Sequence, residues 1–256
     1  MALQLAFEVT GEGPPLLVLH GLFGSGNNWR SVARALASTH RVYCVDLRNH
    51  GASPWADTMG YAEMADDVRA LIADQGLGRP AVVGHSMGGK TAMALALESP
   101  EVLGHLVVVD IVPVAYGDRM SPYVEAMRSL DATALASRTE AQRRLLSMIP
   151  EPAVVPFLLQ NLVARNDHFD WRLNLAAIGA AVPALSSFPP DLLSRRYEGP
   201  ATLIAGANSN YVSATDVPEF KRLFPRATVH TIAGAGHWVH ADKPADFVTA
   251  LRLALG

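Results

Sequence analysis

Short apolar runs alternate along this chain with segments whose apolar residues recur at helical spacing. A strand in a parallel sheet that is covered on both faces is apolar at nearly every position. Residues 3–9 alternate between apolar and polar, which predicts an edge strand, and further strands are predicted over residues 15–20, 41–47, 80–85, 105–112, 201–206 and 227–233. Helices are predicted over residues 61–75, 87–98, 216–224 and 242–255. The last of these helices is expected to be capped by Asp242. Strands and helices in this order predict a doubly wound, mostly parallel α/β sheet.

The alternation stops between residues 113 and 198, where we find no convincing strand. Amphipathic helical segments such as 121–130 and 139–149 occur there instead, with prolines between them. The pattern predicts a core made of residues 1–112 and 199–256, with residues 113–198 inserted as a helical lid after the strand that ends at Asp110.

Composition narrows the class of protein. Half of the 256 residues are apolar, 18% are charged and the net charge is −3, so we expect a soluble globular protein with no affinity for nucleic acid or an anionic membrane surface. The single cysteine, Cys44, excludes an intrachain disulfide and is expected in the core. We expect no secretion signal at the start of the given sequence, and no apolar stretch that approaches the roughly 18–20 residues of a membrane span. We therefore expect a cytoplasmic location, and the sequence does not indicate an oligomeric state.

The segment VVGHSMGGKT, residues 82–91, fits two motifs that exclude each other. Gly84 to Gly88 reads G-x-S-x-G, the nucleophile elbow of serine hydrolases. Gly84 to Thr91 also reads G-x-x-x-x-G-K-T, the P-loop that binds nucleotide phosphates. Both motifs need a strand before them and a helix after them. Asp110, at the end of a later strand, would even supply the acidic group that a nucleotide-bound magnesium ion needs.

Three features favour the hydrolase. His20-Gly21 ends an early strand, where α/β hydrolases place the second amide of the oxyanion hole. His237 follows the last strand, where this fold carries its general base, and a P-loop protein has no use for it. The order Ser86, Asp110, His237 is the order of nucleophile, acid and base in this fold. A P-loop usually follows the first strand of its sheet, so nucleotide binding is kept as the weaker alternative.

The chain resembles the compact α/β-hydrolase esterases, most closely the bacterial YbfF-type acyl-ester and acyl-CoA hydrolases and their eukaryotic relatives. The resemblance lies in residues 20–25, 45–51, 84–90, 109–111, 208–212 and 234–240. It implies an α/β-hydrolase fold with a lid and a small acyl ester or thioester as substrate. A preference for coenzyme A thioesters rests on the resemblance alone, because nine arginines and nine acidic residues balance each other over residues 113–198.

The catalytic roles follow from position. Ser86 is expected to be the nucleophile and His237 its general base. Many α/β hydrolases carry the acid in the loop after the strand that corresponds to residues 201–206 here, three residues past a glycine. In this chain the residue three past Gly206 is Ser209, which cannot ionise to a carboxylate. Asp110 is the expected replacement, with Asp216 as the other candidate. The resembled subgroup also uses the Asp110 position.

Other residues are expected to bind the oxyanion, to line the acyl pocket or to hold loops in place. The backbone amides of Leu22 and Met87 are expected to form the oxyanion hole, with the Phe23 amide as an alternative. Side chains expected to line the acyl pocket are those of Phe23 and Tyr211. Lys90 is expected to be an ordinary helix residue whose amine reaches solvent or a local partner. Residues expected to hold loops in place are His20, Arg48, Asn49, His85 and Trp238, with Asp46 structural as well.

The predicted function is hydrolysis of carboxylic esters or acyl thioesters with small to medium acyl groups. No cofactor is expected, and no metal, because the H-x-x-H of His237 and His240 lacks a third ligand. Carbon–carbon bond hydrolysis, perhydrolysis or a lyase reaction on the same fold is the main alternative, because a fold does not decide its chemistry. A non-catalytic ligand receptor that retains the catalytic residues is a further alternative.

Overall fold

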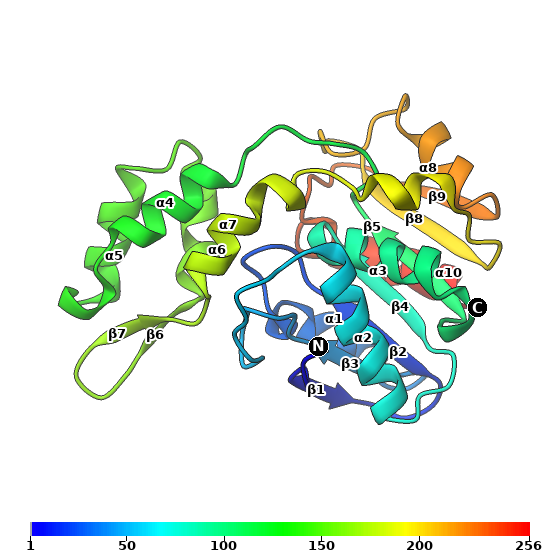
Figure 1. The fold of residues 1–256 in the computed structure, drawn as a ribbon, viewed down its shortest axis with the longest axis horizontal. Coiled ribbons are helices and arrows are strands. Elements are labelled where there is room, and N and C mark those ends of the chain that lie inside the picture. The colour runs from blue at the N-terminus through cyan, green and yellow to red at the C-terminus, as the bar shows by residue number, and fades with distance from the viewer. Residues whose placement is uncertain (1) are drawn as a thin grey trace.

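The computed structural model describes residues 2–256 and contains a seven-stranded sheet with helices on both faces (Figure 1). Its strands are β1 (Phe7–Thr10), β2 (Pro15–Leu19), β3 (Arg41–Val45), β4 (Ala81–His85), β5 (His105–Val109), β8 (Ala201–Gly206) and β9 (Ala227–Ile232). They lie in the order β1-β3-β2-β4-β5-β8-β9. Only β1, at the edge, is antiparallel to its neighbour. The predicted α/β class and mostly parallel sheet are confirmed.

Each face of the sheet is covered by its own set of helices. Helices α2 (Tyr61–Asp74), α3 (Met87–Glu98) and α8 (Val217–Leu223) contribute to one core, and α1 (Arg30–Leu36) and α10 (Pro244–Leu255) to the other. Strand β2 shows why the central strands are apolar throughout. Leu17 and Leu19 face the first core, whereas Leu16 and Val18 face the second, and all four are buried.

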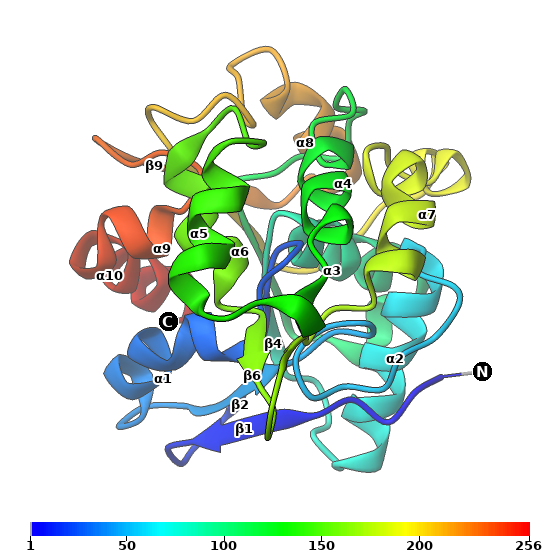
Figure 2. The ribbon, with the colours of Figure 1, turned by 90° about the vertical axis from the view of Figure 1, so that its left-hand side faces the viewer.

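The segment predicted as a lid lies between β5 and β8. It contains α4 (Ser121–Ser129), α5 (Arg138–Leu146), α6 (Val155–Leu159) and α7 (Leu175–Leu185), which Figure 1 shows to one side of the sheet. Figure 2, seen from that side, shows these helices in front of the sheet. A short antiparallel hairpin, β6 (Leu162–Ala164) with β7 (Phe169–Trp171), corrects the expectation of no strand in this segment. Two strands of three residues each are too short for a recognisable alternation.

Several element ends differ from the sequence prediction. Strand β5 ends at Val109 rather than residue 112, because Asp110 adopts a φ of 52°. Asp242 does not cap the last helix: it closes the short helix α9 (Val239–Asp242), and its carboxylate accepts a hydrogen bond from the Gly236 amide at 2.8 Å. Helix α1 has no counterpart in the sequence prediction.

Residues 175–194 have the length and apolar composition of a membrane span, with a mean hydropathy of 1.2. They correct the expectation that no apolar stretch approaches that length. The stretch comprises α7 and a following 3-10 helix, Pro190–Ser194. Because Val182 and Leu185 are buried and line a cavity, part of its apolar surface is used inside the protein.

Candidate active site

Ser86 and Asp110 occupy equivalent positions at the ends of neighbouring strands. They directly follow β4 and β5, whose last residues, His85 and Val109, are paired in register. The Ser86 amide donates to the Val109 carbonyl at 3.1 Å. Both residues have a positive φ, 53° at Ser86 and 52° at Asp110, which residues other than glycine rarely adopt. Such strained backbone is typical of functional sites.

The glycines around Ser86 allow a tight turn from strand β4 into helix α3. A β-carbon on Gly84 would lie 2.1 Å from the carbonyl oxygen of Gly88, and one on Gly88 would lie 2.5 Å from that of Leu19. Side chains are therefore excluded at both positions by backbone atoms. The G-x-S-x-G spacing is thus explained by close packing of the turn, as a nucleophile elbow requires.

The carboxylate of Asp110 is fully buried and accepts three hydrogen bonds. Its Oδ1 accepts from the Gly206 amide at 2.8 Å, and its Oδ2 accepts from Nδ1 of His237 at 2.8 Å and from the Ser209 hydroxyl. Because a carboxylate can only accept, Nδ1 of His237 carries the hydrogen and Nε2 is free to act as a base. Asp216, the other candidate acid, is half-buried and bonds instead to the amide of Ser213 at 3.1 Å. The structure thus brings His237 to Asp110.

Two aromatic side chains hold His237 in place. The Tyr211 ring stacks on the His237 ring with centroids 3.8 Å apart. Nε2 of His85 lies 2.9 Å from the carbonyl oxygen of His237. Burial lowers the pKa of His85 well below its usual value, so His85 is neutral and donates from Nε2. Its position fits the expected role in holding a loop.

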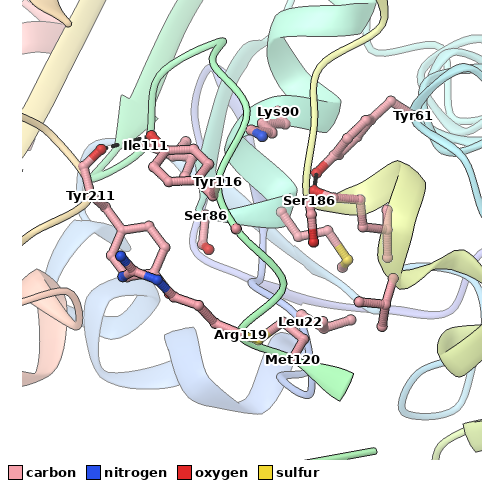
Figure 3. A pocket seen from close by; sticks show the side chains of 14 residues that line it. Leu22, Tyr61, Ser86, Lys90, Ile111, Tyr116, Arg119, Met120, Ser186 and Tyr211 are labelled. Carbon is pink, nitrogen blue, oxygen red and sulfur yellow. Dashed lines mark hydrogen bonds between the residues drawn. The ribbon is translucent and has the colours of Figure 1, made fainter. Parts of the chain in front are cut away.

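A small cavity of about 60 Å³ opens beside Ser86 (Figure 3). Four residues with a predicted role in the site line this cavity: Leu22, Ser86, Met87 and Tyr211. Further lining residues, for which the sequence predicts no role in the site, include Lys90, Tyr116, Arg119, Met120, Val182 and Leu185. Typical ligand pockets span roughly 300–1,000 Å³. In this conformation the cavity therefore has room for a small group only.

The amides of Leu22 and Met87 are the predicted donors of the oxyanion hole. Among the hydrogen bonds of residues 2–256, none uses either amide as donor. The Phe23 amide, by contrast, donates to Nε2 of His50 at 3.3 Å. This excludes Phe23 as the alternative donor in this conformation. Ser86 and His237 are not hydrogen-bonded to each other here, as is common before substrate binding.

Comparison with known proteins gives the family. The model of the family described as "Alpha/beta hydrolase family" matches residues 16–250. The chain belongs to the α/β-hydrolase family. It is 42% identical to an sn-1-specific diacylglycerol lipase, ABHD11, of Xenopus tropicalis, over 96% of this chain and 79% of the relative. It is 35% identical to esterase YbfF of Escherichia coli K12, over 93% of this chain and 91% of the relative.

A solved structure described as a marine microorganism esterase has the same architecture. It matches this α/β hydrolase with a TM-score of 0.94 and 36% identity, covering 98% of this chain and 99% of its own. The predicted fold, family and ester-hydrolase class are confirmed by these matches. The nucleotide-binding alternative is thereby excluded as the explanation of the Gly84–Thr91 motif.

Phe23 does not line the cavity of this α/β hydrolase, contrary to expectation. It occupies a tight turn with a φ of 62° and is buried in the main core. Its ring meets that of Tyr123 edge-on at 6.4 Å, and its carbonyl accepts from Asn161 at 2.8 Å. Phe23 therefore joins the core to the inserted segment. Its neighbour Leu22 faces the cavity instead.

Lys90 also differs from expectation. Its side chain does not reach solvent: the residue is 2% exposed and lies in the cavity wall. The sequence offered one signal for this, since Lys90 is four residues after Ser86 and therefore on the same face of the helix.

Other predicted loop-holding residues behave as expected. His20 accepts from the Leu47 amide at 3.0 Å, and the buried guanidinium of Arg48 pairs with Asp67. His240 stacks on Trp29 at 4.2 Å, and burial lowers its pKa to about 4. No group of three or more potential metal ligands occurs in the part of the chain that the structure describes.

Proposed function

We propose that Ser86 is the nucleophile of a two-step ester hydrolysis and that His237 and Asp110 complete a catalytic triad. The main support is the fully buried carboxylate of Asp110, which holds Nδ1–H of His237 at 2.8 Å. This bond selects the tautomer whose Nε2 accepts a proton. A catalytic triad also needs a nucleophile beside the substrate cavity. Ser86 lines this cavity and lies on a strained turn that presents its hydroxyl.

In the first step Nε2 of His237 takes the Ser86 proton as Oγ attacks the ester carbonyl carbon. The carbonyl oxygen becomes an oxyanion, which the Leu22 and Met87 amides stabilise, Met87 being at the positive end of helix α3. His237 gives its proton to the departing alcohol, leaving an acyl group on Ser86. Asp110 stabilises the imidazolium but is not itself protonated.

In the second step water attacks the acyl-enzyme and His237 accepts one water proton. The Ser86 oxygen then leaves, takes that proton back, and releases the carboxylic acid. No cofactor takes part in either step.

We propose small to medium acyl groups as substrates. A cavity of about 60 Å³ supports this, because it cannot contain a long chain without movement of the surrounding residues. The leaving group would lie outside the cavity. The relatives named diacylglycerol lipase and esterase make glycerolipid esters and simple esters the first compounds to test, and coenzyme A thioesters the second.

The test is steady-state hydrolysis over a matched ladder of acyl lengths, as p-nitrophenyl esters, diacylglycerols and coenzyme A thioesters, with Ser86→Ala as the blank. We expect ester turnover that falls by several orders of magnitude in Ser86→Ala. Turnover retained by Ser86→Ala would overturn the assignment. Higher kcat/KM for thioesters would make the protein an acyl-CoA hydrolase. Slow reaction with activated short esters alone would favour carbon–carbon bond hydrolysis or another chemistry of this fold.

A further inference from the structure

The buried amine of Lys90 contacts both ends of the inserted segment. Its Nζ donates to the carbonyl oxygen of Val114 at 2.9 Å and to that of Ser187 at 2.7 Å. Val114 lies where the chain leaves β5 for the insertion, and Ser187 lies where it returns from α7. One side chain on the nucleophile helix α3 therefore joins two segments that are more than 70 residues apart in sequence.

The surroundings of this amine are aromatic and contain no carboxylate partner. The Nζ lies 4.7 Å from the centroid of the Tyr116 ring and 5.8 Å from that of Tyr61 on α2. No ion pair within residues 2–256 involves Lys90. Burial without a counter-charge lowers the pKa of Lys90 to about 7. Since a buried cation is costly unless its hydrogens are bonded, the two carbonyls are what allow the amine to remain there.

The two connecting segments also bond to each other around Lys90. The Tyr116 amide donates to the Ser186 carbonyl at 2.7 Å. The second segment is also bonded to α2, because the Tyr61 hydroxyl donates to the Leu185 carbonyl at 2.7 Å. The same segments supply one wall of the cavity beside Ser86. Residues 111–120 contribute Ile111, Tyr116, Gly117, Arg119 and Met120 to that wall, and α7 with its end contributes Val182, Leu185 and Ser186.

We infer that Lys90 is a positioning residue that holds both ends of the insertion against the nucleophile helix and so sets the width of the acyl cavity. When both bonds are made, the wall stays close to Ser86. When they are lost, the two segments separate from α3 and the cavity widens. The inference rests on the proposed function for its effect on substrates, but the contact itself is independent of catalysis.

The first test is hydrogen exchange of Lys90→Met, which keeps the length of the side chain and removes its donors. We expect amides in residues 112–117 and 185–188 to exchange at least about tenfold faster than in the unaltered protein. Lys221→Met is the matched control, because Lys221 is exposed on α8 and far along the chain from both segments. Unchanged exchange in folded Lys90→Met would overturn the inference.

The second test is the acyl-length ladder with Lys90→Met. A wider cavity should raise kcat/KM for long esters relative to the shortest ester by about tenfold. A purely structural role would lower turnover on all lengths alike, so an unchanged ratio would overturn the effect on the cavity. If the unaltered protein hydrolyses no ester, the proposed function fails, and the exchange measurement still decides the role of Lys90.

A measurement on the unaltered protein decides the matter if Lys90→Met does not fold. The chain has three lysines, Lys90, Lys221 and Lys243, so nitrogen-15 labelling of lysine gives three side-chain signals. Lys221→Met and Lys243→Met assign the two exposed ones. We expect the remaining amine to exchange its hydrogens slowly, whereas rapid exchange of all three would overturn the inference.

Discussion

Ser209 donates its hydroxyl hydrogen to Oδ2 of Asp110, the same oxygen that accepts from Nδ1 of His237. Ser209 lies in the loop after β8, three residues past Gly206, which is the position of the acid in many α/β hydrolases. Here the carboxylate comes from the end of β5 and the hydroxyl from the usual acid position. The two positions therefore meet at one carboxylate oxygen, the one that also accepts from His237.

This convergence predicts that the acid can be moved. Asp110→Asn should lower kcat/KM by about 10⁴, because His237 is then held in the wrong tautomer. Adding Ser209→Asp to that variant should recover at least tenfold. Ester hydrolysis by the two variants, with circular dichroism to establish folding, checks the prediction. A folded double variant no more active than Asp110→Asn would contradict it.

Ser209 itself should contribute modestly. Ser209→Ala removes one charge-assisted hydrogen bond but leaves the carboxylate two donors, so we expect kcat/KM to fall by no more than about tenfold. A loss as large as that of Asp110→Asn would mean that the serine has a more direct role.

Lys90 should make stability depend on pH above neutrality. Its pKa is lowered in the folded state to about 7, from an ordinary value of 10.5. Between these two values the unfolded chain binds the extra proton, so the free energy of unfolding should rise with pH, by at most about 1.4 kcal/mol per pH unit. Urea titrations from pH 6 to 10 measure the free energy of unfolding. The difference in this free energy between the unaltered protein and Lys90→Met gives the contribution of Lys90 at each pH. A difference that is flat or falls with pH would contradict it.

The buried pair Arg48–Asp67 should be essential for stability. The guanidinium meets both carboxylate oxygens, at 2.7 and 2.8 Å, and both side chains are almost completely buried. Asp67→Asn leaves the arginine without its counter-charge and should lower the free energy of unfolding by about 3–5 kcal/mol. The neighbouring surface pair Arg69–Asp66 is half exposed, so Asp66→Asn should change stability little. Equal effects in urea titrations would refute the distinction.

Arg119 should favour acyl groups that end in a carboxylate. It lines the cavity with its guanidinium 5.3 Å from the Tyr211 ring centroid, and it forms no ion pair with any residue from 2 to 256. Arg119→Gln should lower kcat/KM about tenfold for a half-ester of a dicarboxylic acid. A neutral ester of equal length is the control and should be much less affected. Parallel losses on both substrates would contradict a role in charge recognition.

The fold and the proposed catalytic residues could be predicted because their signals are local. Ser86, Asp110 and His237 each follow an apolar run closely, and the glycines beside Ser86 mark the turn. The other cavity residues could not be found in this way. Phe23 turns into the core because of its backbone conformation, and Lys90 is buried because the two ends of the insertion close over it. Those outcomes depend on contacts between segments distant in sequence, which periodicity does not report.

The matching backbone of Ser86 and Asp110 has an evolutionary consequence. Both depart from paired strand ends with nearly the same φ, so the backbone separation of the proposed nucleophile and acid follows the strand spacing, about 4.8 Å. The sheet thus fixes the backbone positions of Ser86 and Asp110, while loop contacts position His237. The insertion between β5 and β8 can accumulate substitutions that alter which molecules enter, while the chemistry at the strand ends keeps its geometry.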